Sequence, residues 1–200
     1  MFILFGLFRN SLRQVSAITA AVLLVGHVMV TTASAGLMTT SGGIELEFNA
    51  DSYSSNLMHT GASATVLLTF ADEVRASDNL PFVRVTAKAT NTTASTSFGA
   101  GATVATLTGF GLDLIDGVDY VQNTFMAGDK LDTFLMDASA SPFGTLDIAA
   151  ADNNNFNGGN ANGGLKSDPT NDDHIDFFSF GLKSSTSALI DALTMRDSFL

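Results

Sequence analysis

The feature that most constrains this chain is a repeated alternation of apolar and polar residues with a period of two. In residues 44–48 the apolar side chains occupy every second position, with a glutamate at each position between them. Residues 83–89 repeat the pattern with Arg84 and Lys88 at intervening positions. Successive side chains of a β-strand point to opposite faces, so this alternation predicts strands with one buried face.

Other segments are also rich in apolar and β-branched residues, and clusters of Gly, Ser, Asn and Asp separate them. They lie at residues 64–70, 104–107, 110–114, 131–136, 146–149 and 175–182. Helical patterns are absent between them, which favours an all-β fold, an antiparallel β-sandwich of about seven to nine strands, over βαβ units. The expected core consists of Ile44, Leu46, Phe48, Val66, Leu68, Phe70, Val83, Val85, Leu112, Leu114, Phe178 and Phe180.

One short helix is predicted near the C-terminus. Thr186 or Ser187 is suited to cap a helix over residues 188–195, because a hydroxyl oxygen accepts a hydrogen bond from the first turn. Leu189, Ile190 and Leu193 would form its apolar side. We expect this helix to lie over one end of the sandwich.

The first 35 residues have the order of a secretory signal peptide. Arg9 and Arg13 precede an apolar run at residues 15–30, and small residues follow. Ala33 and Ala35 fit the two small-residue positions of a signal peptidase site, which predicts cleavage before Gly36. A retained membrane anchor is the alternative, but the apolar run is shorter than the roughly 20 residues that span a bilayer. We therefore expect no membrane span in the mature chain and export through the general secretory pathway.

The predicted mature chain, residues 36–200, is of a size for one domain and strongly acidic. Loss of Arg9 and Arg13 leaves 7 of the 9 basic residues against all 20 acidic ones, a formal charge of −13. Nucleic-acid binding depends on basic residues that neutralise phosphates, so no nucleic-acid partner is expected. The chain has no cysteine, so its fold depends on the hydrophobic core without disulfides. Disulfide-free export is more typical of a bacterial protein than of a small eukaryotic module.

Calcium is the one cofactor for which the sequence offers candidate ligands. Oxygen-bearing side chains are frequent in and beside residues 152–174, and calcium takes about 6 to 8 oxygen ligands. The spacing matches neither an EF-hand nor the Gly-rich calcium nonapeptide. The candidate cation site consists of Asp172, Asp173 and Asp176, which bracket His174 at the start of a predicted strand. The favoured interpretation is a solvated, turn-rich loop with no bound cofactor.

Signatures of catalysis are missing from the sequence. There is no G-x-S-x-G to mark a serine nucleophile and no Gly-rich segment with the spacing of a nucleotide-binding loop. Of the three histidines, His27 lies in the predicted signal peptide, His59 lies in a Ser/Gly/Thr-rich segment and His174 lies beside aspartates. We therefore expect no catalytic residues and no enzyme activity.

Several segments resemble those of a known class of exported proteins. They are ATVLLTF at residues 64–70, VRVTAKATNT at 83–92, LTGFGLDL at 107–114, NGGNANGGL at 157–165 and FFSF at 177–180. With the leader, they resemble bacterial exosortase-dependent (PEP-CTERM type) exported proteins. The resemblance implies a β-sandwich exported by a Gram-negative bacterium and associated with the cell surface or extracellular polysaccharide, with no catalytic residues to carry over.

The chain departs from that class at its C-terminus. Such proteins end in a Pro-Glu-Pro type motif, an apolar helix and a basic tail, whereas this sequence stops at Asp197-Ser198-Phe199-Leu200. We expect either a truncated chain or a protein that is released rather than sorted.

The sequence therefore predicts a non-enzymatic structural or matrix-associated protein, secreted or on the surface of a Gram-negative bacterium, such as in a biofilm matrix. Extracellular polysaccharide or other surface proteins are the expected partners. The alternative is a secreted carbohydrate-binding module or polysaccharide hydrolase, which the sandwich architecture alone suggests.

Overall fold

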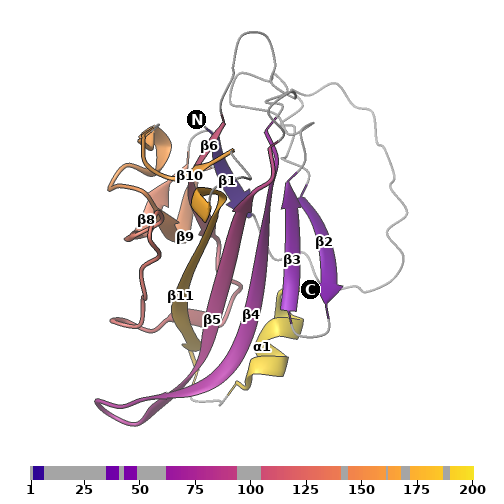
Figure 1. Ribbon diagram of the computed structural model, residues 1–200. Helices are drawn as coiled ribbons and strands as arrows, with labels where there is room; N and C mark the ends of the chain where they lie inside the picture. The colour runs from indigo at the N-terminus through magenta and orange to yellow at the C-terminus, as the bar shows by residue number, and fades with distance from the viewer. Residues whose placement is uncertain are drawn as a thin grey trace, which may run out of the picture.

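The structure is a computed structural model with eleven strands in two sheets and one α-helix within its described part (Figure 1). The described residues are 2–6, 35–40, 43–48, 62–93, 105–140, 144–160, 162–167, 172–186 and 190–200. Nine strands have five or more residues, and the other two have three and two residues. The all-β fold with two facing sheets and a short C-terminal helix confirms the predicted fold class.

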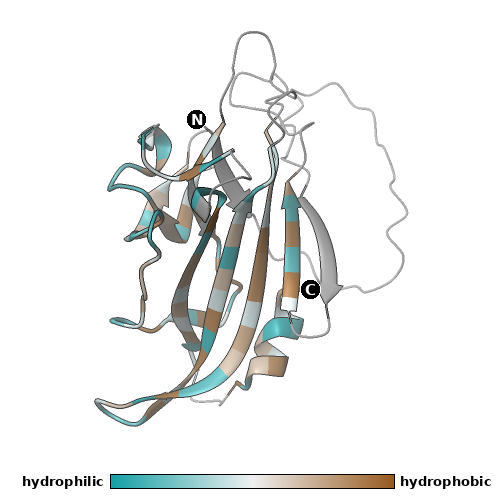
Figure 2. Ribbon diagram, viewed as in Figure 1, coloured by the Kyte–Doolittle hydropathy of each residue, from teal (hydrophilic) through white to brown (hydrophobic). Residues whose placement is uncertain are grey.

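The larger sheet has the order β2-β3-β4-β5-β11-β7, and each neighbouring pair is antiparallel. Its strands are β2 (Ala35–Thr40), β3 (Gly43–Phe48), β4 (Ala64–Arg75), β5 (Leu80–Asn91), β11 (Ile175–Ser184) and β7 (Val118–Tyr120). Figure 2 shows hydrophobic and hydrophilic bands alternating along β3, β4 and β5, as the sequence pattern predicts. Asn79, in the turn between β4 and β5, has a φ of 57°, a conformation that asparagine tolerates.

The smaller sheet has the order β1-β6-β9-β8, and β10 also pairs with β6. Its strands are β1 (Phe2–Gly6), β6 (Thr106–Leu112), β8 (Thr133–Ser139), β9 (Thr145–Ala151) and β10 (Leu165–Lys166). All pairs are antiparallel except β1 with β6, which is parallel. The two strands predicted at residues 104–107 and 110–114 are therefore one described strand, β6.

The main core lies between the two sheets. The rings of Phe110 on β6 and Phe178 on β11 lie with centroids 6.2 Å apart, which joins the sheets across this core. Ten of the twelve predicted core residues are buried, and Phe70 and Leu114 are partly buried against them. The period of two therefore assigned the inner face correctly.

A second, smaller apolar cluster forms around Phe156, which is 4 % exposed. Phe156 begins the short 3-10 helix η1 (Phe156–Gly158) inside the Asn/Gly-rich segment. It packs with Ala149 and Ala151 of β9, and a Cβ atom added at Gly109 of β6 would lie 2.8 Å from its ring. The segment predicted to be a solvated loop is thus anchored by a buried ring.

The helix α1 (Ala192–Ser198) begins later than predicted. Asp191 is its N-cap and accepts a hydrogen bond from the Thr194 N–H at 2.7 Å, while Ile190 is not helical. This hydrogen bond lowers the pKa of Asp191. Because a cap carboxylate satisfies a free N–H of the first turn, Asp191 fixes the start of the helix in place of Thr186 or Ser187. Phe199 packs on Phe70, with centroids 5.8 Å apart, at one end of the larger sheet.

The predicted signal peptide lies mostly outside the described residues. Strand β1 falls within it, and Ala35 and Gly36 are the first two residues of β2, where they pair with Phe48 and Glu47 of β3. Ala33 is not among the described residues. Removal of residues 1–35 would take β1 from the edge of the smaller sheet and leave β2 five residues, so cleavage before Gly36 stays a prediction.

Candidate functional site

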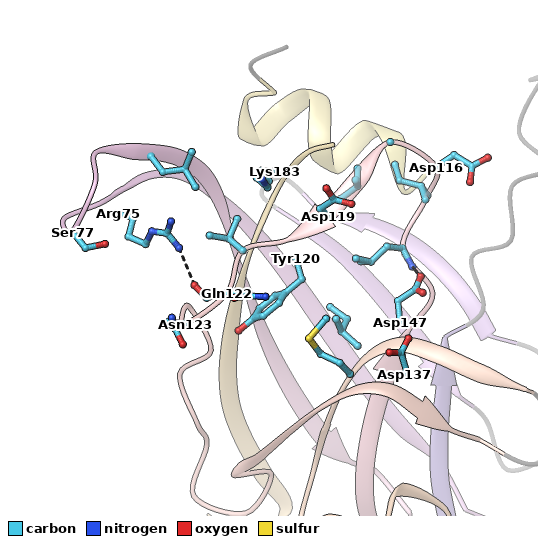
Figure 3. A pocket seen from close by; sticks show the side chains of 18 of the residues that line it. Arg75, Ser77, Asp116, Asp119, Tyr120, Gln122, Asn123, Asp137, Asp147 and Lys183 are labelled. Carbon is cyan, nitrogen blue, oxygen red and sulfur yellow. Dashed lines mark hydrogen bonds between the residues drawn. The ribbon is translucent and has the colours of Figure 1, made fainter. Parts of the chain in front are cut away.

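An open groove of about 1080 Å³ lies beside the β4–β5 hairpin at one end of the sandwich (Figure 3). Figure 1 shows this hairpin projecting beyond the rest of the larger sheet. Its walls come from five parts of the chain: the hairpin, residues 114–123, β8, β9 and the end of β11. Both sheets therefore contribute to one concave surface. A large concave surface where polar side chains from several elements meet is a candidate binding site.

Tyr120 forms an aromatic base for this groove. Its ring lies 4.5 Å from that of Phe134, and Phe134 lies 5.0 Å from Phe125 (centroid distances). All three rings pack against the main core. The Tyr120 ring is therefore fixed from behind by the interior of the protein, while part of the residue stays exposed to the groove (Figure 3). A rigid aromatic surface of this kind loses little conformational entropy when a ligand packs on it.

Arg75 ties the hairpin wall to the neighbouring loop. Its guanidinium group donates a hydrogen bond to the Gln122 carbonyl at 2.9 Å and two to the carboxylate of Asp78, at 2.9 and 2.5 Å. The hydrogen bonds from Arg75 lower the pKa of Asp78 to about 2, and the same contact raises the pKa of Arg75. The positive charge of Arg75 is thus largely neutralised by an aspartate outside the groove.

Two aspartates lie on neighbouring strands of the opposite wall. Asp137 of β8 and Asp147 of β9 both lie between the paired positions Met136–Ile148 and Ala138–Leu146. The Asp147 carboxylate accepts a hydrogen bond from the Leu114 N–H at 2.7 Å. Asp137 has a φ of 51°, a conformation that costs energy for a residue other than glycine. Strand β8 therefore has a left-handed backbone conformation at a residue that lines the groove.

The structure gives the aspartates of the predicted cation site different partners. Asp176 is 4 % exposed, and its carboxylate accepts hydrogen bonds from the backbone N–H groups of Asp129, Lys130, Leu131 and Phe177, at 2.7 to 3.0 Å. A Cβ atom at Gly128 would overlap this carboxylate, so the loop passes directly against it.

Asp173 lies at the surface instead. Its carboxylate pairs with the Lys130 ammonium group at 2.8 Å, which raises the pKa of Lys130. The side chain of Asp172, in the 3-10 helix η2 (Asp172–His174), lies outside the described residues. No three acidic or histidine side chains within the described part are placed to hold a metal ion. Asp173 and Asp176 each have protein donors, and calcium binding stays a prediction without a described ligand set.

Asp152, another candidate oxygen ligand, is the anchor of the Asn/Gly-rich loop. One carboxylate oxygen accepts a hydrogen bond from the Asn160 N–H at 2.8 Å. The other is buried, and the structure gives it no hydrogen-bond partner. Burial raises the pKa of Asp152, and the nearby charge of Asp132 adds to this effect.

The groove was not predicted from the sequence. No motif in the sequence marks its aspartates, and none of its described lining residues is a histidine. His59, one of the two histidines outside the predicted signal peptide, lies outside the described residues, and His174, the last residue of η2, is not part of the groove lining. The one local signal was Asp116-Gly117, a turn dipeptide, and Gly117 has a φ of 89°.

Comparison with known proteins provides no relative: no family model, no curated protein and no solved structure matches this chain. Within the described residues, no helix is both long and apolar enough to cross a membrane.

Proposed function

We propose that this protein is a non-enzymatic, exported protein that attaches to extracellular polysaccharide at the surface of a Gram-negative bacterium. The end groove is its glycan-binding site. The leader-like N-terminus, the acidic composition and the resemblance to exosortase-dependent proteins support the location. The groove supports the binding activity.

The observation that carries the proposal is the combination of Tyr120 with polar side chains around it. A pyranose ring has an apolar C–H face that packs on aromatic rings and a rim of hydroxyl groups that need hydrogen-bond partners. Tyr120 offers the first contact, and the side chains of Gln122 and Asn123 with four aspartates offer the second. The openness of the groove at the end of the sandwich suits a polymer chain that passes through it.

Binding to immobilised neutral oligosaccharides tests the proposal. We expect Gln122→Ala to weaken binding, because its exposed side chain lines the groove while only its backbone carbonyl holds Arg75. Glu47→Gln is the matched control, since Glu47 is an exposed residue of β3 outside the groove. Absence of binding to any neutral or charged glycan would refute the glycan site. Recovery of the native protein from the cytoplasm of its host would refute the location.

A polysaccharide hydrolase is the second candidate, and the pair Asp137 and Asp147 favours it. Two carboxylates flank the scissile bond in most glycosidases. Acid and base roles require environments that differ between the two groups, and both of these residues are exposed. Release of reducing ends from a polysaccharide, lost in Asp137→Asn, would support hydrolysis over binding alone.

A further inference from the structure

The charge of the end groove determines which glycans fit it. Four aspartates line the groove, Asp116, Asp119, Asp137 and Asp147, against two basic residues, Arg75 and Lys183. Asp78 neutralises most of the charge of Arg75 from outside. The formal count of the lining, 2 − 4, is −2, and with Asp78 included it is −3. The net charge of the lining therefore repels a polyanionic glycan, although Lys183, opposite Asp119 in the β7–β11 pairing, is a positive group within it.

The carboxylates come from four parts of the chain and do not all meet at one point, although Asp137 and Asp147 are cross-strand neighbours. Asp116 lies in a turn, Asp119 in β7, Asp137 in β8 and Asp147 in β9 (Figure 3). No three of the described acidic side chains are grouped as a metal site requires. Separate carboxylates around an aromatic surface suit a ligand that carries several separate positive charges.

The whole chain strengthens this preference. Its formal charge is −11, so its long-range field repels polyanions and attracts polycations before contact. In physiological salt, charges act over about 8 Å, so the groove aspartates decide the preference once the ligand is bound. The long-range field of the chain and the groove aspartates therefore both favour a positively charged ligand.

We propose that the end groove selects a polysaccharide with free amino groups, a cationic amino-sugar polymer, over uncharged and acidic ones. This inference rests on the proposed glycan-binding function. Protonated amino groups on successive sugars pair with the spread aspartates, and a sugar ring packs on Tyr120. Exposed ion pairs are individually weak, so the preference arises from two or three of them together.

The test compares three hexasaccharides by isothermal titration calorimetry on the purified protein at pH 6: a glucosamine hexamer, its N-acetylated form and an oligogalacturonate. We expect the glucosamine hexamer to bind about tenfold more tightly than the acetylated one and the oligogalacturonate most weakly. The preference should shrink at 0.5 M salt and at pH 8, where the amino groups lose protons.

The variant Asp116→Asn/Asp119→Asn/Asp137→Asn removes three groove charges at exposed positions. Asparagine also tolerates the positive φ of residue 137. We expect it to abolish the preference and to keep binding of the acetylated hexamer, whereas Glu47→Gln should change neither. A circular dichroism melt of each variant confirms that it is folded.

Each other outcome overturns a defined part of the argument. Equal binding of the amino and acetylated hexamers overturns the charge selection and leaves glycan binding intact. Binding of neither overturns the proposed function as well. Competition by oligolysine as strong as that of the glucosamine hexamer, with no binding of the acetylated hexamer, overturns the assignment to sugars and indicates a basic peptide partner.

Discussion

Two loops of this protein each pack around an aspartate, and they differ in how many hydrogen-bond donors they give its carboxylate. The loop at residues 128–131 surrounds Asp176 with backbone N–H donors, and Phe177 adds a fourth from the strand itself. The Asn/Gly-rich loop gives Asp152 a hydrogen bond from Asn160 and leaves its other oxygen buried without a partner. The more buried carboxylate is thus the better satisfied one.

The difference teaches what decides the cost of a buried charge here. An ionised carboxylate has about four lone-pair sites, and burial is costly only where these lose water without gaining donors. Asp176 replaces water with oriented N–H groups, so it fastens residues 128–131 to β11. Asp152 loses water on one side without a replacement, which is why burial raises its pKa. Four substitutions test this comparison, and their expected effects on stability decrease from the first to the last.

The largest effect is expected where a carboxylate meets no donors at all. Val85 is 1 % exposed in the main core, and Val85→Asp should leave the chain unfolded, because an unpaired buried charge costs several kcal/mol of a total stability of about 5 to 15 kcal/mol. Lys88→Asp is the control, since Lys88 lies on the outer face of the same strand. Near-ultraviolet circular dichroism checks both, and a folded Val85→Asp protein would mean that the faces are misassigned.

Asp176→Asn tests the satisfied carboxylate. The amide keeps the shape of the side chain but has one acceptor oxygen, so some of the four N–H donors lose their partner. We expect the free energy of unfolding to fall by about 2 to 3 kcal/mol in urea titration. Asp173→Asn affects only the surface pair with Lys130, so it should lower the free energy of unfolding by less than about 1 kcal/mol. Equal losses in the two variants would show that the donors around Asp176 contribute no special stability.

Asp152→Asn tests the unsatisfied carboxylate and should stabilise the protein at neutral pH, by up to about 1 kcal/mol. The pH dependence of this gain follows from the raised pKa. Because the folded-state pKa of Asp152 lies above the unfolded value of about 4, its carboxyl group favours the folded state at low pH, and this advantage is lost as pH rises through the folded-state pKa. The gain of the variant should therefore be present at pH 7 and absent at pH 3. Thermal melts at the two pH values decide it, and destabilisation at pH 7 would contradict the cost assigned to the unpartnered oxygen.

The sequence predicted the parts of the fold that have a period. Strands β3 and β5 alternate over five or more residues, and their inner faces were predicted correctly. Strands β7 and β10 have three and two residues, too few for a pattern. Strand β6 was predicted as two strands, on either side of Thr108 and Gly109. In the fold, Gly109 and Gly111 leave room for Phe156 and Leu146.

The candidate site could not be predicted, for a different reason. Arg75 and Gln122 are 47 residues apart in the sequence and meet through a single hydrogen bond to a backbone carbonyl, which no side-chain pattern encodes. The aspartates of the groove are separate in the sequence and indistinguishable from those of any solvated turn. The same holds for Asp176, whose position three residues after Asp173 suggested a shared cation, although in the fold Asp176 accepts backbone hydrogen bonds and Asp173 forms a surface ion pair.

The smallest effect is expected for a carboxylate that keeps its water, Asp78 in the hairpin wall. Its hydrogen bonds with Arg75 lower its pKa to about 2. A depressed pKa adds stability above the unfolded value of about 4, and this contribution is lost as pH falls through about 2. Because the pair is exposed, water and salt screen it, so Asp78→Asn should leave the melting midpoint at pH 7 almost unchanged. A large drop in the melting midpoint at pH 7 would show that the pair of Asp78 and Arg75 stabilises the hairpin despite solvent screening. Position in the fold, more than the number of hydrogen-bond donors, would then decide how much each aspartate contributes to stability.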